Sequence, residues 1–457
     1  MNIHCIVGAG FSGLPVAKKL LEIGDEVVVL DRNDGPGGLW HTGAYDHASI
    51  ISSRRTTELP DYPMPDDYPD FPSKPQMAEY LAGYASTFGL DRHCRFATTV
   101  ERVRPGHDRR WLVEVDEGDP VEADTVTIAT GHHSTPKLIS HPGDWDGEIM
   151  RSDEYRNAEQ LAGRRVLVIG YGNTGCDVAV TAARANGVAD ISMRGGGYFF
   201  PKLFLGVPTA ELGRHLPIKG DRVDRLIART IHRCATGDLA AYGMPRPGYR
   251  ILDKHPIVNG ELPTLVRHGR IRPRPEVDRL DGQRVHFADG TNAEYDLIVY
   301  AVGYRVTLPM LKDEDNLIDW EDDLPVIHSQ LIAPKVRGLF INGLGQARTG
   351  GGPLFEESGY LLARMAAHEA RSGVPITDAI SANPAIRFAK SVLGYRSVAK
   401  ADTRSYGVAH VTRSLRHLRS ILDSIGCPDA PSERTQPAPA PAGQRRRTLA
   451  AAGGQGR

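Results

Sequence analysis

The sequence predicts an α/β fold with two Rossmann-like dinucleotide-binding domains, because a pattern of strand, glycine turn and helix occurs twice. Residues 3–7 and residues 165–169 are apolar, β-favouring runs of the kind that a parallel sheet buries. Each run leads directly into glycines in G-x-G-x-x-G spacing, then into a helix with apolar periodicity, and then into a second strand. This order is that of a nucleotide-binding βαβ unit, so its repetition indicates two nucleotide sites in one chain.

Length and composition agree with a globular protein of two domains. The chain has 457 residues, of which 40% are hydrophobic and 24% are charged, and its formal net charge is −1. This neutral balance gives no indication of nucleic acid or an anionic membrane as a partner. The first strand begins within three residues of Met1, and no apolar run approaches the roughly 20 residues of a membrane helix. We therefore expect a cytoplasmic protein without a signal peptide or a membrane span.

The five cysteines are scattered along the chain and never form a C-x-x-C pair. This usage fits a reducing compartment, and it argues against both a zinc site and a dithiol redox centre. We therefore expect no metal.

The three glycines of the first turn have distinct tasks. Gly8 permits a tight turn, Gly10 lets the backbone approach a pyrophosphate, and Gly13 lets the helix pack closely on the strand. The helix expected over 14–23 places its positive N-terminus at the phosphates, and the following strand ends in Asp31, which suits a ribose hydroxyl. This turn is expected to hold a dinucleotide such as FAD. The residues predicted to bind it are Gly8, Ala9, Gly10, Phe11, Ser12, Gly13 and Asp31.

The second turn repeats this spacing, but its second strand ends differently. After a helix over 177–185, the strand over 189–194 ends in Arg194, where the first unit has an acid. Arginine at that place suits the 2′-phosphate of NADPH, although an ordinary surface arginine remains an alternative. Two nucleotides on one chain suggest that hydride passes from the second to the first, since a flavin accepts it. The residues predicted to bind NADPH are Gly172, Asn173, Thr174, Gly175, Cys176, Asp177 and Arg194.

Four further segments resemble those of the flavin-containing monooxygenases (class B flavoprotein monooxygenases). GGLWHTGAY at 37–45 resembles the segment that reaches the flavin, and residues 61–90 resemble the proline-rich stretch and the helix after it. Residues 125–143 match the strand and A-T-G turn before the second domain, and residues 296–305 resemble the A-T-G-Y strand. Together the segments cover most of residues 1–345 in the order of that family. The resemblance implies that FAD is also bound by Gly38, Leu39, Trp40 and Val100.

The signature of that family, aromatic-x-Gly-x-x-x-His-x-x-x-Tyr/Phe, is present with one change. In WDGEIMRSDEY, Trp145, Gly147 and Tyr155 match, but Arg151 occupies the histidine position. Tyr155 is closer to the heteroatom-oxidising branch than to the Baeyer–Villiger enzymes, whose signature ends in Trp. An arginine is permanently charged, whereas histidine switches near neutral pH. If this position links the two domains, Arg151 is expected to form a hydrogen bond across the junction, and it is therefore a candidate catalytic residue.

A second departure concerns the active-site asparagine of the family. Counting back from Asp61, its position falls at Ile51 or Ser52, and neither is asparagine. Ser52 carries a hydroxyl that could donate a hydrogen bond near the flavin. It is therefore the second candidate catalytic residue.

The order of the motifs implies that the NADPH domain is inserted into the FAD domain. We predict an FAD-binding domain of residues 1–160 and 295–426, an NADPH-binding domain of residues 161–294, and a disordered tail over 427–457. Short strands joined by Asp-Gly turns end the insertion, and the buried strand within 296–305 is expected to return to the first sheet. A strand, a glycine-rich loop and a helix after residue 337 are implied to close over the isoalloxazine.

The resemblance implies an FAD- and NADPH-dependent monooxygenase. It would insert one oxygen atom from O2 into a small organic substrate through a C4a-hydroperoxyflavin, at a soft nitrogen or sulfur. In such enzymes the cofactor carries out the chemistry, and the protein excludes water and orients the partners. The substrate itself is not identified by the sequence, and a homodimer is possible.

Several alternatives stay open at this point. Baeyer–Villiger oxygenation of a ketone and oxidative decarboxylation of a 2-oxo acid use the same cofactor pair, and Tyr155 counts mildly against the former. An NADPH-dependent flavin reductase or oxidase, for example a quinone reductase, would consume NADPH without oxygenating a substrate. A flavoprotein that kept the fold and lost turnover, and acts only in binding, is a further class.

Overall fold

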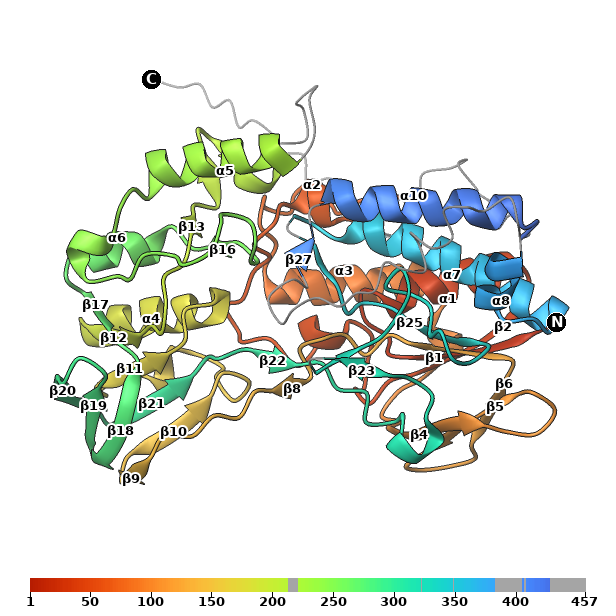
Figure 1. Ribbon diagram of the computed structural model, residues 1–457, viewed down its shortest axis with the longest axis horizontal. Coiled ribbons are helices and arrows are strands. Elements are labelled where there is room, and N and C mark those ends of the chain that lie inside the picture. Colours follow the sequence, from red (N-terminus) through yellow and green to blue (C-terminus); the bar gives the residue numbers. More distant parts are fainter. Residues whose placement is uncertain (213–220, 322, 348, 383–404, 407, 428–457) are drawn as a thin grey trace, which may run out of the picture.

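The computed structural model places two lobes side by side (Figure 1) and describes residues 1–212, 221–321, 323–347, 349–382, 405–406 and 408–427. The first lobe is built on a five-stranded parallel sheet in the order β25-β7-β1-β2-β3. Its strands are β1 (Ile3–Val7), β2 (Glu26–Leu30), β3 (Cys94–Arg95), β7 (Thr125–Ile128) and β25 (Leu339–Ile341). The strand that leads into the first glycine turn is therefore central in its sheet.

The second lobe repeats this sheet. Five parallel strands lie in the order β10-β21-β11-β12-β17, and β11, which leads into the second glycine turn, is again central. They are β10 (Glu148–Arg151), β11 (Val166–Ile169), β12 (Ala189–Ser192), β17 (Ile271–Arg274) and β21 (Leu297–Tyr300). The α/β fold with two parallel sheets is thus confirmed.

One strand lies in a different sheet from the one predicted. The buried strand expected to return to the first sheet is β21, and it lies in the second sheet, hydrogen-bonded to β10 on one side and β11 on the other. Its four residues are all buried, and such an apolar run suits the centre of either parallel sheet, so composition alone does not select one. The domain limits at 160 and 295 stay a prediction. The pairing of β10 with β21 favours limits near 148 and 300 instead.

Each lobe has three layers. In the first lobe α1 (Gly13–Glu22), α3 (Lys74–Thr87), α7 (Gly352–Ser372) and α10 (Val408–Ser424) share one buried core with the parallel sheet. The other face of that sheet shares a second core with an antiparallel sheet of β4 (Val100–Pro105), β5 (Trp111–Val115) and β6 (Val121–Ala123). Alternate residues of β1 serve the two cores, because successive side chains of a strand point to opposite faces.

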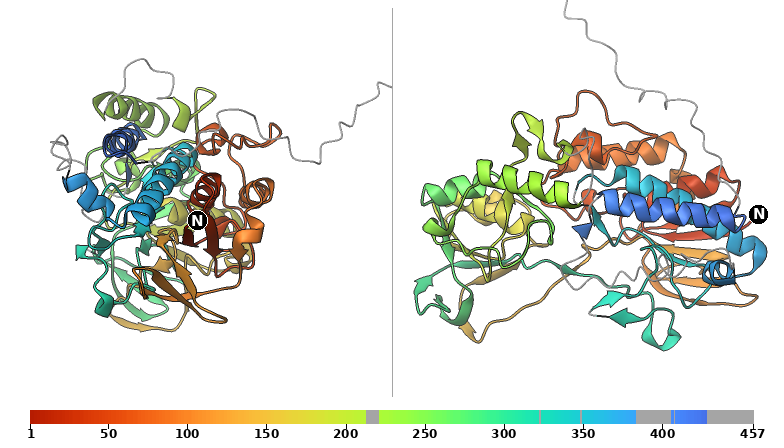
Figure 2. Two further views of the ribbon diagram at one scale, coloured as in Figure 1. Left: turned by 90° about the vertical axis from the view of Figure 1, so that its right-hand side faces the viewer. Right: turned by 45° about the horizontal axis from the view of Figure 1, so that its top comes forward.

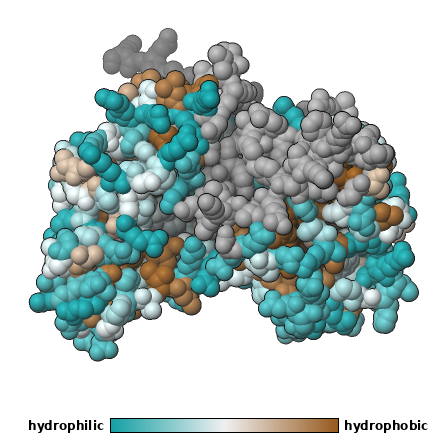
Figure 3. Space-filling model, viewed as in Figure 1, coloured by the Kyte–Doolittle hydropathy of each residue, from teal (hydrophilic) through white to brown (hydrophobic). Residues whose placement is uncertain are grey.

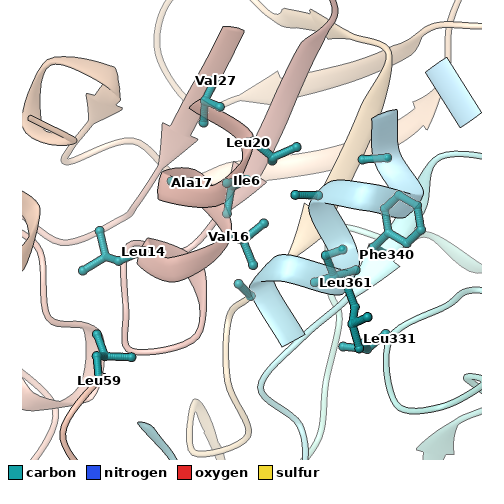
Figure 4. Packing of buried hydrophobic residues seen from close by; sticks show 14 of the residues in the cluster. Ile6, Leu14, Val16, Ala17, Leu20, Val27, Leu59, Leu331, Phe340 and Leu361 are labelled. Atoms are coloured by element: carbon teal, nitrogen blue, oxygen red, sulfur yellow. The ribbon is translucent and has the colours of Figure 1, made fainter. Parts of the chain in front are cut away.

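The packing of α1 against the sheet and α7 fixes the first glycine turn in place. Leu14, Val16 and Leu20 of α1 are essentially inaccessible to solvent, as are Phe340 of β25 and Leu361 of α7. Figure 4 shows these side chains gathered between α1, the strands and α7. Truncating one buried leucine of this kind to alanine costs about 2–5 kcal/mol of stability. The N-terminus of α1 is therefore held rigidly above the end of β1.

The second lobe has the same layers. Its helices α4 (Asn173–Asn186) and α6 (Glu261–Arg267) share a core with one face of the parallel sheet. The other face packs against a second sheet, whose antiparallel strands β18 (Val277–Gly282), β19 (Arg284–Phe287) and β20 (Asn292–Glu294) are joined by the parallel strand β9 (Gly143–Trp145). The expected short strands joined by Asp-Gly turns are present here.

Within residues 1–347, leaving out the undescribed 213–220 and 322, two crossings connect the lobes, and they lie together. One crossing contains β8 (Thr135–Pro136) and the other contains β22 (Tyr304–Arg305), which pair antiparallel. The hydroxyls of Thr135 and Thr307 are 2.6 Å apart beside them. Figure 1 shows both strands between the two lobes.

The remaining elements are short or lie at the surface, and Figure 2 shows α5 from two further sides. Within the described part of the chain, no helix is long and apolar enough to cross a membrane. Cys427, predicted to begin the tail, is buried in the first core, whereas 428–457 lie outside the described residues. The remaining helices and strands are α2 (Arg54–Thr57), α5 (Asp221–Ala235), α8 (Ile376–Ala382), β13 (Phe199–Phe200), β14 (Leu203–Phe204), β15 (Val207–Pro208), β16 (Ile257–Val258), β23 (Trp320–Glu321), β24 (Leu324–Pro325), β26 (Gln346–Ala347) and β27 (Ser405–Tyr406).

Candidate functional site

The first glycine turn needs two of its glycines for the fold itself. Gly8 has a φ of +114°, and a Cβ there would lie 2.6 Å from the carbonyl oxygen of Ala129, at the end of β7. A Cβ on Gly13 would lie 1.9 Å from the carbonyl oxygen of Gly8. Gly10 is different, because a Cβ there would meet only the Cα of Gly38 at 3.7 Å, an ordinary contact. The space above Gly10 is therefore left open by the protein, as a closely approaching pyrophosphate requires.

The second turn has the same geometry. Gly170 has a φ of +112°, and a Cβ there would lie 2.3 Å from the carbonyl oxygen of Ala301, at the end of β21. A Cβ on Gly175 would lie 2.2 Å from the oxygen of Gly170, whereas one on Gly172 would meet nothing within 4 Å. In both turns, only the middle glycine has free space where a Cβ would lie. Both turns therefore have room for the pyrophosphate of a dinucleotide. The contacts of Ala129 and Ala301 were not predicted, although each follows the strand next to the glycine turn in its own lobe.

Asp31 holds the first turn to the end of β2. Its buried carboxylate accepts hydrogen bonds from the backbone N–H of Ala9 at 2.6 Å and from that of Asn33 at 2.8 Å. Each carboxylate oxygen retains a second lone pair, so Asp31 can also accept a ribose hydroxyl. The predicted role of Asp31 therefore fits its position, and the same side chain also rigidifies the turn.

Residues 37–45, which resemble the flavin-reaching segment of the family, lie directly over the first turn. The N–H of Gly37 donates to the carbonyl oxygen of Ala9 at 2.9 Å, and a Cβ on Gly38 would lie 3.1 Å from the Cα of Gly10. Leu39 is 39% exposed. Because Gly38 has a φ of +54°, glycine suits this approach both by space and by conformation. The structure thus brings Gly38 together with the predicted turn residues.

Other predicted flavin residues lie in two places. Phe11 makes an edge-on ring contact with Phe355 near the start of α7, with centroids 5.1 Å apart. Val100 is buried at the start of β4, and its side chain packs in the second core. Asn342, which the sequence did not single out, donates from Nδ2 to the carbonyl oxygen of Ser12 at 3.1 Å and ties the end of β25 to the turn.

Arg194 lies just beyond the end of β12, at the edge where the adenosine part of a nucleotide would lie. It is exposed, and within the described part of the chain its guanidinium has no ion pair. Arg272 and Arg274 on the neighbouring strand β17 differ, because both pair with the buried Asp190, at 2.6 and 2.7 Å. Arg194 is therefore the arginine of this group that stays available for a 2′-phosphate.

The glycines after Arg194 are needed for close packing. Tyr171, within the second glycine turn, donates from its hydroxyl to the carbonyl oxygen of Gly196 at 3.3 Å. A Cβ on Gly196 would lie 2.1 Å from the carbonyl oxygen of Pro245, and one on Gly197 would lie 2.5 Å from Cδ1 of Ile257. The chain after Arg194 thus lies tightly between Tyr171 and two other segments. This packing explains Gly196 and Gly197 of the R-G-G-G stretch at 194–197.

Three predicted NADPH residues on α4 direct their side chains into the protein. Asn173 accepts the N–H of Val258 at 2.7 Å and donates to the carbonyl oxygen of Pro256 at 3.2 Å. Asp177 accepts hydrogen bonds at both oxygens from protein groups. Cys176 is fully buried, and burial raises the pKa of its thiol. The groups that the start of α4 offers to a phosphate are therefore its free backbone N–H groups and the half-buried Thr174.

The two candidate catalytic residues belong to different lobes and contact different residues. Arg151, at the end of β10, pairs with Asp153 at 3.1 Å and with Glu154 at 3.0 Å, both within its own segment, and its side chain is 40% exposed. A hydrogen bond of Arg151 across the junction is not seen among the described residues. The hydroxyl of Ser52 lies 2.7 Å from that of Thr57 in α2.

The turn that carries Ser52 is pressed against the start of α7. A Cβ on Gly350 would lie 2.0 Å from the carbonyl oxygen of Thr56, and one on Gly352 would lie 2.0 Å from that of Glu58. The glycine-rich loop before α7 is therefore glycine-rich because it packs on α2. This contact places Ser52 close to the loop that the resemblance implies over the isoalloxazine.

The signature tyrosine lies at the junction of the lobes. Tyr155 is fully buried, and its ring lies 5.6 Å from that of Tyr45 and 5.8 Å from that of His47. Residues 45–49, which we call the junction strap, belong to the first lobe and follow the flavin-reaching segment. Tyr45 donates from its hydroxyl to Oδ2 of Asp177 at 2.5 Å. The strap therefore joins the first lobe to α4 of the second.

Two glycine turns of matching geometry, one followed by a buried acid and the other by an exposed arginine, define a dinucleotide-binding protein of the oxidoreductase type with a separate site for each of two nucleotides. A sequence model described as flavin-binding monooxygenase-like matches residues 3–354. The chain belongs to this family. It is therefore an NADPH-dependent flavin monooxygenase that uses FAD and NADPH.

Known proteins agree with this assignment. Indole-3-pyruvate monooxygenase YUCCA1 of Oryza sativa subsp. japonica is 32% identical over 331 residues, which cover 69% of this chain and 80% of the relative. Flavin-containing monooxygenase 5 of Oryctolagus cuniculus is 31% identical over 342 residues, which cover 68% of this chain and 64% of the relative. The open crystal structure of cyclohexanone monooxygenase has a TM-score of 0.70 at 18% identity, over 93% of this chain and 98% of that one, which shows a shared fold.

Figure 3 shows hydrophilic residues over most of the described surface in that view. Among the described residues, no group of three or more histidine, cysteine, aspartate or glutamate side chains could hold a metal ion.

Proposed function

We propose that the protein inserts one oxygen atom from O2 at a soft heteroatom, an amine nitrogen or a sulfide sulfur, of a small organic substrate. The observation that carries this proposal is Tyr155, the last residue of the signature, which is fully buried against Tyr45 and His47 at the junction of the lobes. The resemblance associates tyrosine at this place with heteroatom oxidation, and Baeyer–Villiger enzymes have Trp there. Tyrosine and tryptophan at this buried position would pack differently at the junction of the lobes. The type of aromatic residue is therefore expected to affect how the lobes meet.

The protein supports this chemistry by binding and orienting. When bound, the cofactor pair supplies hydride and activates O2, and no side-chain nucleophile is needed. Gly10 and Gly172 leave the space for two pyrophosphates, and Arg194 offers a cation to the 2′-phosphate. Ser52 is proposed to offer a hydroxyl beside the flavin, where the family has asparagine. Its hydroxyl lies 2.7 Å from that of Thr57, and when Thr57 is the donor of this pair the Ser52 hydrogen is left for the flavin.

A second candidate substrate class is a 2-oxo acid, which would be oxidatively decarboxylated. Lys202 of the second lobe donates to the hydroxyl of Ser49 in the junction strap at 2.6 Å, and its ammonium lies 5.3 Å from the ring centre of Phe71. Burial lowers the pKa of Lys202, which the nearby Asp177 opposes. This partly desolvated ammonium contacts Ser49, which lies three residues before Ser52 in the chain, and it suits a carboxylate. The named activity of the YUCCA1 relative, on indole-3-pyruvate, favours testing this class.

A substrate panel separates the candidates. Oxygen uptake and NADPH consumption are measured with a tertiary amine, a sulfide, a ketone and an aromatic 2-oxo acid, and the products are identified by mass. Heteroatom oxygenation adds one oxygen to the product, whereas decarboxylation releases CO2 and leaves an acid one carbon shorter. The variant Lys202→Met should lower kcat/KM for the 2-oxo acid alone. Product from the ketone alone would contradict both proposals, and anaerobic NADPH consumption with a quinone would indicate a reductase.

A further inference from the structure

We infer that Asp177 and Tyr45 form a positioning pair that holds the NADPH site in register with the flavin site. The pair is the hydrogen bond from the Tyr45 hydroxyl to Oδ2 of Asp177, which joins the first lobe to the second. The inference rests on the NADPH-to-flavin electron transfer of the family and not on the substrate proposed above. It assigns Asp177 a role through protein contacts, where the sequence suggested a direct contact with NADPH.

Asp177 is unsuited to hold a phosphate directly. Both of its oxygens already accept protein hydrogen bonds, at 2.5 Å from Tyr45 and at 2.7 Å from Nδ2 of Asn259. A carboxylate facing a pyrophosphate would also repel it, because both carry negative charge. The Tyr45 hydroxyl remains a donor, since burial and the charge of Asp177 both raise its pKa. The three side chains therefore form a satisfied network without any ligand.

Short and ordered segments connect this pair to both glycine turns. On the first lobe, Gly38 lies against Gly10, and the chain from Gly38 to Tyr45 is held by its own backbone hydrogen bonds, including Ala44 N–H to the oxygen of Leu39 at 2.9 Å. On the second lobe, Asp177 lies five residues after Gly172 on α4, a rise of about 7.5 Å. The hydrogen bond thus links the two pyrophosphate positions over a short path.

Neighbouring contacts reinforce the link. Asn259, whose Oδ1 accepts the N–H of Leu262 at 2.8 Å, fixes the start of α6 to Asp177. His47 and Thr181 approach within 3.3 Å one turn further along α4. The backbone N–H of Asp46 donates to the oxygen of Arg156 at 2.9 Å, next to the signature tyrosine. The junction strap therefore contacts α4 and the signature segment together.

The physical reason for such a pair is the distance that hydride transfer demands. The nicotinamide and the flavin must approach to about 3–3.5 Å, and a displacement of about 1 Å costs on the order of a hundredfold in rate. The nucleotides are held on separate lobes, so their relative position depends on contacts between the lobes. Loss of the Tyr45 hydroxyl is expected to loosen that position while leaving each glycine turn intact.

The test uses the FAD-loaded enzyme and the variants Tyr45→Phe, Asp177→Asn and their combination. Tyr45→Phe keeps the ring and removes only the hydroxyl, so it should fold even if Asp177→Asn does not. Rapid mixing with NADPH under anaerobic conditions gives two quantities, the limiting rate of flavin reduction and the apparent Kd for NADPH. The matched control is Tyr242→Phe, which removes the hydroxyl of a 42% exposed tyrosine in the second lobe.

Each single variant should lower the limiting rate about tenfold or more, because a hydrogen bond to a charged group is lost, while the Kd changes by less than about threefold. The double variant should be no slower than the slower single variant, since both remove one interaction. Tyr242→Phe should behave as the wild type. A wild-type limiting rate in Tyr45→Phe, a higher Kd with an unchanged limiting rate, or additive losses in the double variant would each overturn the inference.

Discussion

Replacing Gly172 with alanine should weaken NADPH binding without unfolding the protein or releasing the flavin. A Cβ at this position meets no protein atom within 4 Å, and the φ of −68° is one that alanine adopts readily. The stability of the folded chain should therefore stay the same, or rise by up to about 1 kcal/mol, because alanine restricts the unfolded chain. The added methyl group projects into the space that a closely approaching pyrophosphate needs.

The expected loss of NADPH affinity is estimated from the cost of overpacking. An inserted methyl group that cannot be avoided typically costs about 1–3 kcal/mol, so the Kd for NADPH should rise by about 5- to 150-fold. Gly10→Ala is the counterpart in the first lobe, where the nearest protein atom would be 3.7 Å away. It should lower flavin occupancy and leave binding of NADP+ to the second lobe nearly unchanged.

The assay measures each ligand separately. Flavin occupancy is read from the absorbance of the purified protein, binding of NADP+ by calorimetric titration, and folding by the thermal midpoint. Gly248→Ala is the control, because a Cβ there also meets nothing within 4 Å and Gly248 lies outside both turns. If Gly172→Ala released the flavin, or if both variants affected the same ligand, the assignment of one nucleotide to each turn would be wrong.

Three further outcomes follow from single groups. Arg194→Ala should raise the KM for NADPH about 10- to 100-fold and leave the KM for NADH unchanged. Steady-state kinetics with both nucleotides would measure this, and an equal rise in both KM values would contradict a 2′-phosphate contact. Burial raises the pKa of the Glu369 carboxyl from 4.5 to about 7. Between these two pH values the carboxyl is protonated in the folded chain and ionised in the unfolded chain. The free energy of unfolding should therefore fall by roughly 3 kcal/mol as pH rises from about 4.5 to 7. Urea titrations at several pH values should show that the unfolding free energy of Glu369→Gln varies less with pH than that of the wild type. If the two proteins showed the same pH dependence, Glu369 would not be its source. Arg151→Ala should change NADPH consumption and product yield by less than about threefold, because the exposed pairs of Arg151 lie within its own segment.

The fold was largely predictable because its signals are local. The strands at 3–7 and 166–169, the helices after them, and the glycine spacing follow from periodicity and turn chemistry within about 30 residues. The fold class and the family are confirmed. The prediction that β21 lies in the first sheet was wrong, because a run of four buried residues suits either parallel sheet equally well. Sheet membership there depends on contacts with β10 and β11, which sequence periodicity does not report.

The site was predictable only in part, for a related reason. The glycine turns, Asp31 and Arg194 lie within single βαβ units, and their geometry fits the predicted roles, although ligand binding by each residue stays a prediction. The Tyr45–Asp177 contact joins residues 132 apart in sequence, and no local pattern marks it. Cytoplasmic location and assembly as a homodimer also stay predictions.

The two lobes repeat one design, and this repetition identifies the residues that distinguish the ligands. Both turns use a glycine with φ near +110° against the alanine that follows a neighbouring strand, so we expect the turn itself not to distinguish FAD from NADPH. The difference must arise at the ends of β2 and β12, where Asp31 is buried and bound to the turn while Arg194 is exposed and available. A buried carboxylate disfavours a phosphate beside the ribose, and an available guanidinium favours one. We therefore expect ligand identity to be set locally in each lobe. Electron transfer between the ligands is expected to depend on the contacts between the lobes, namely the junction strap, the paired crossings and the buried Tyr155.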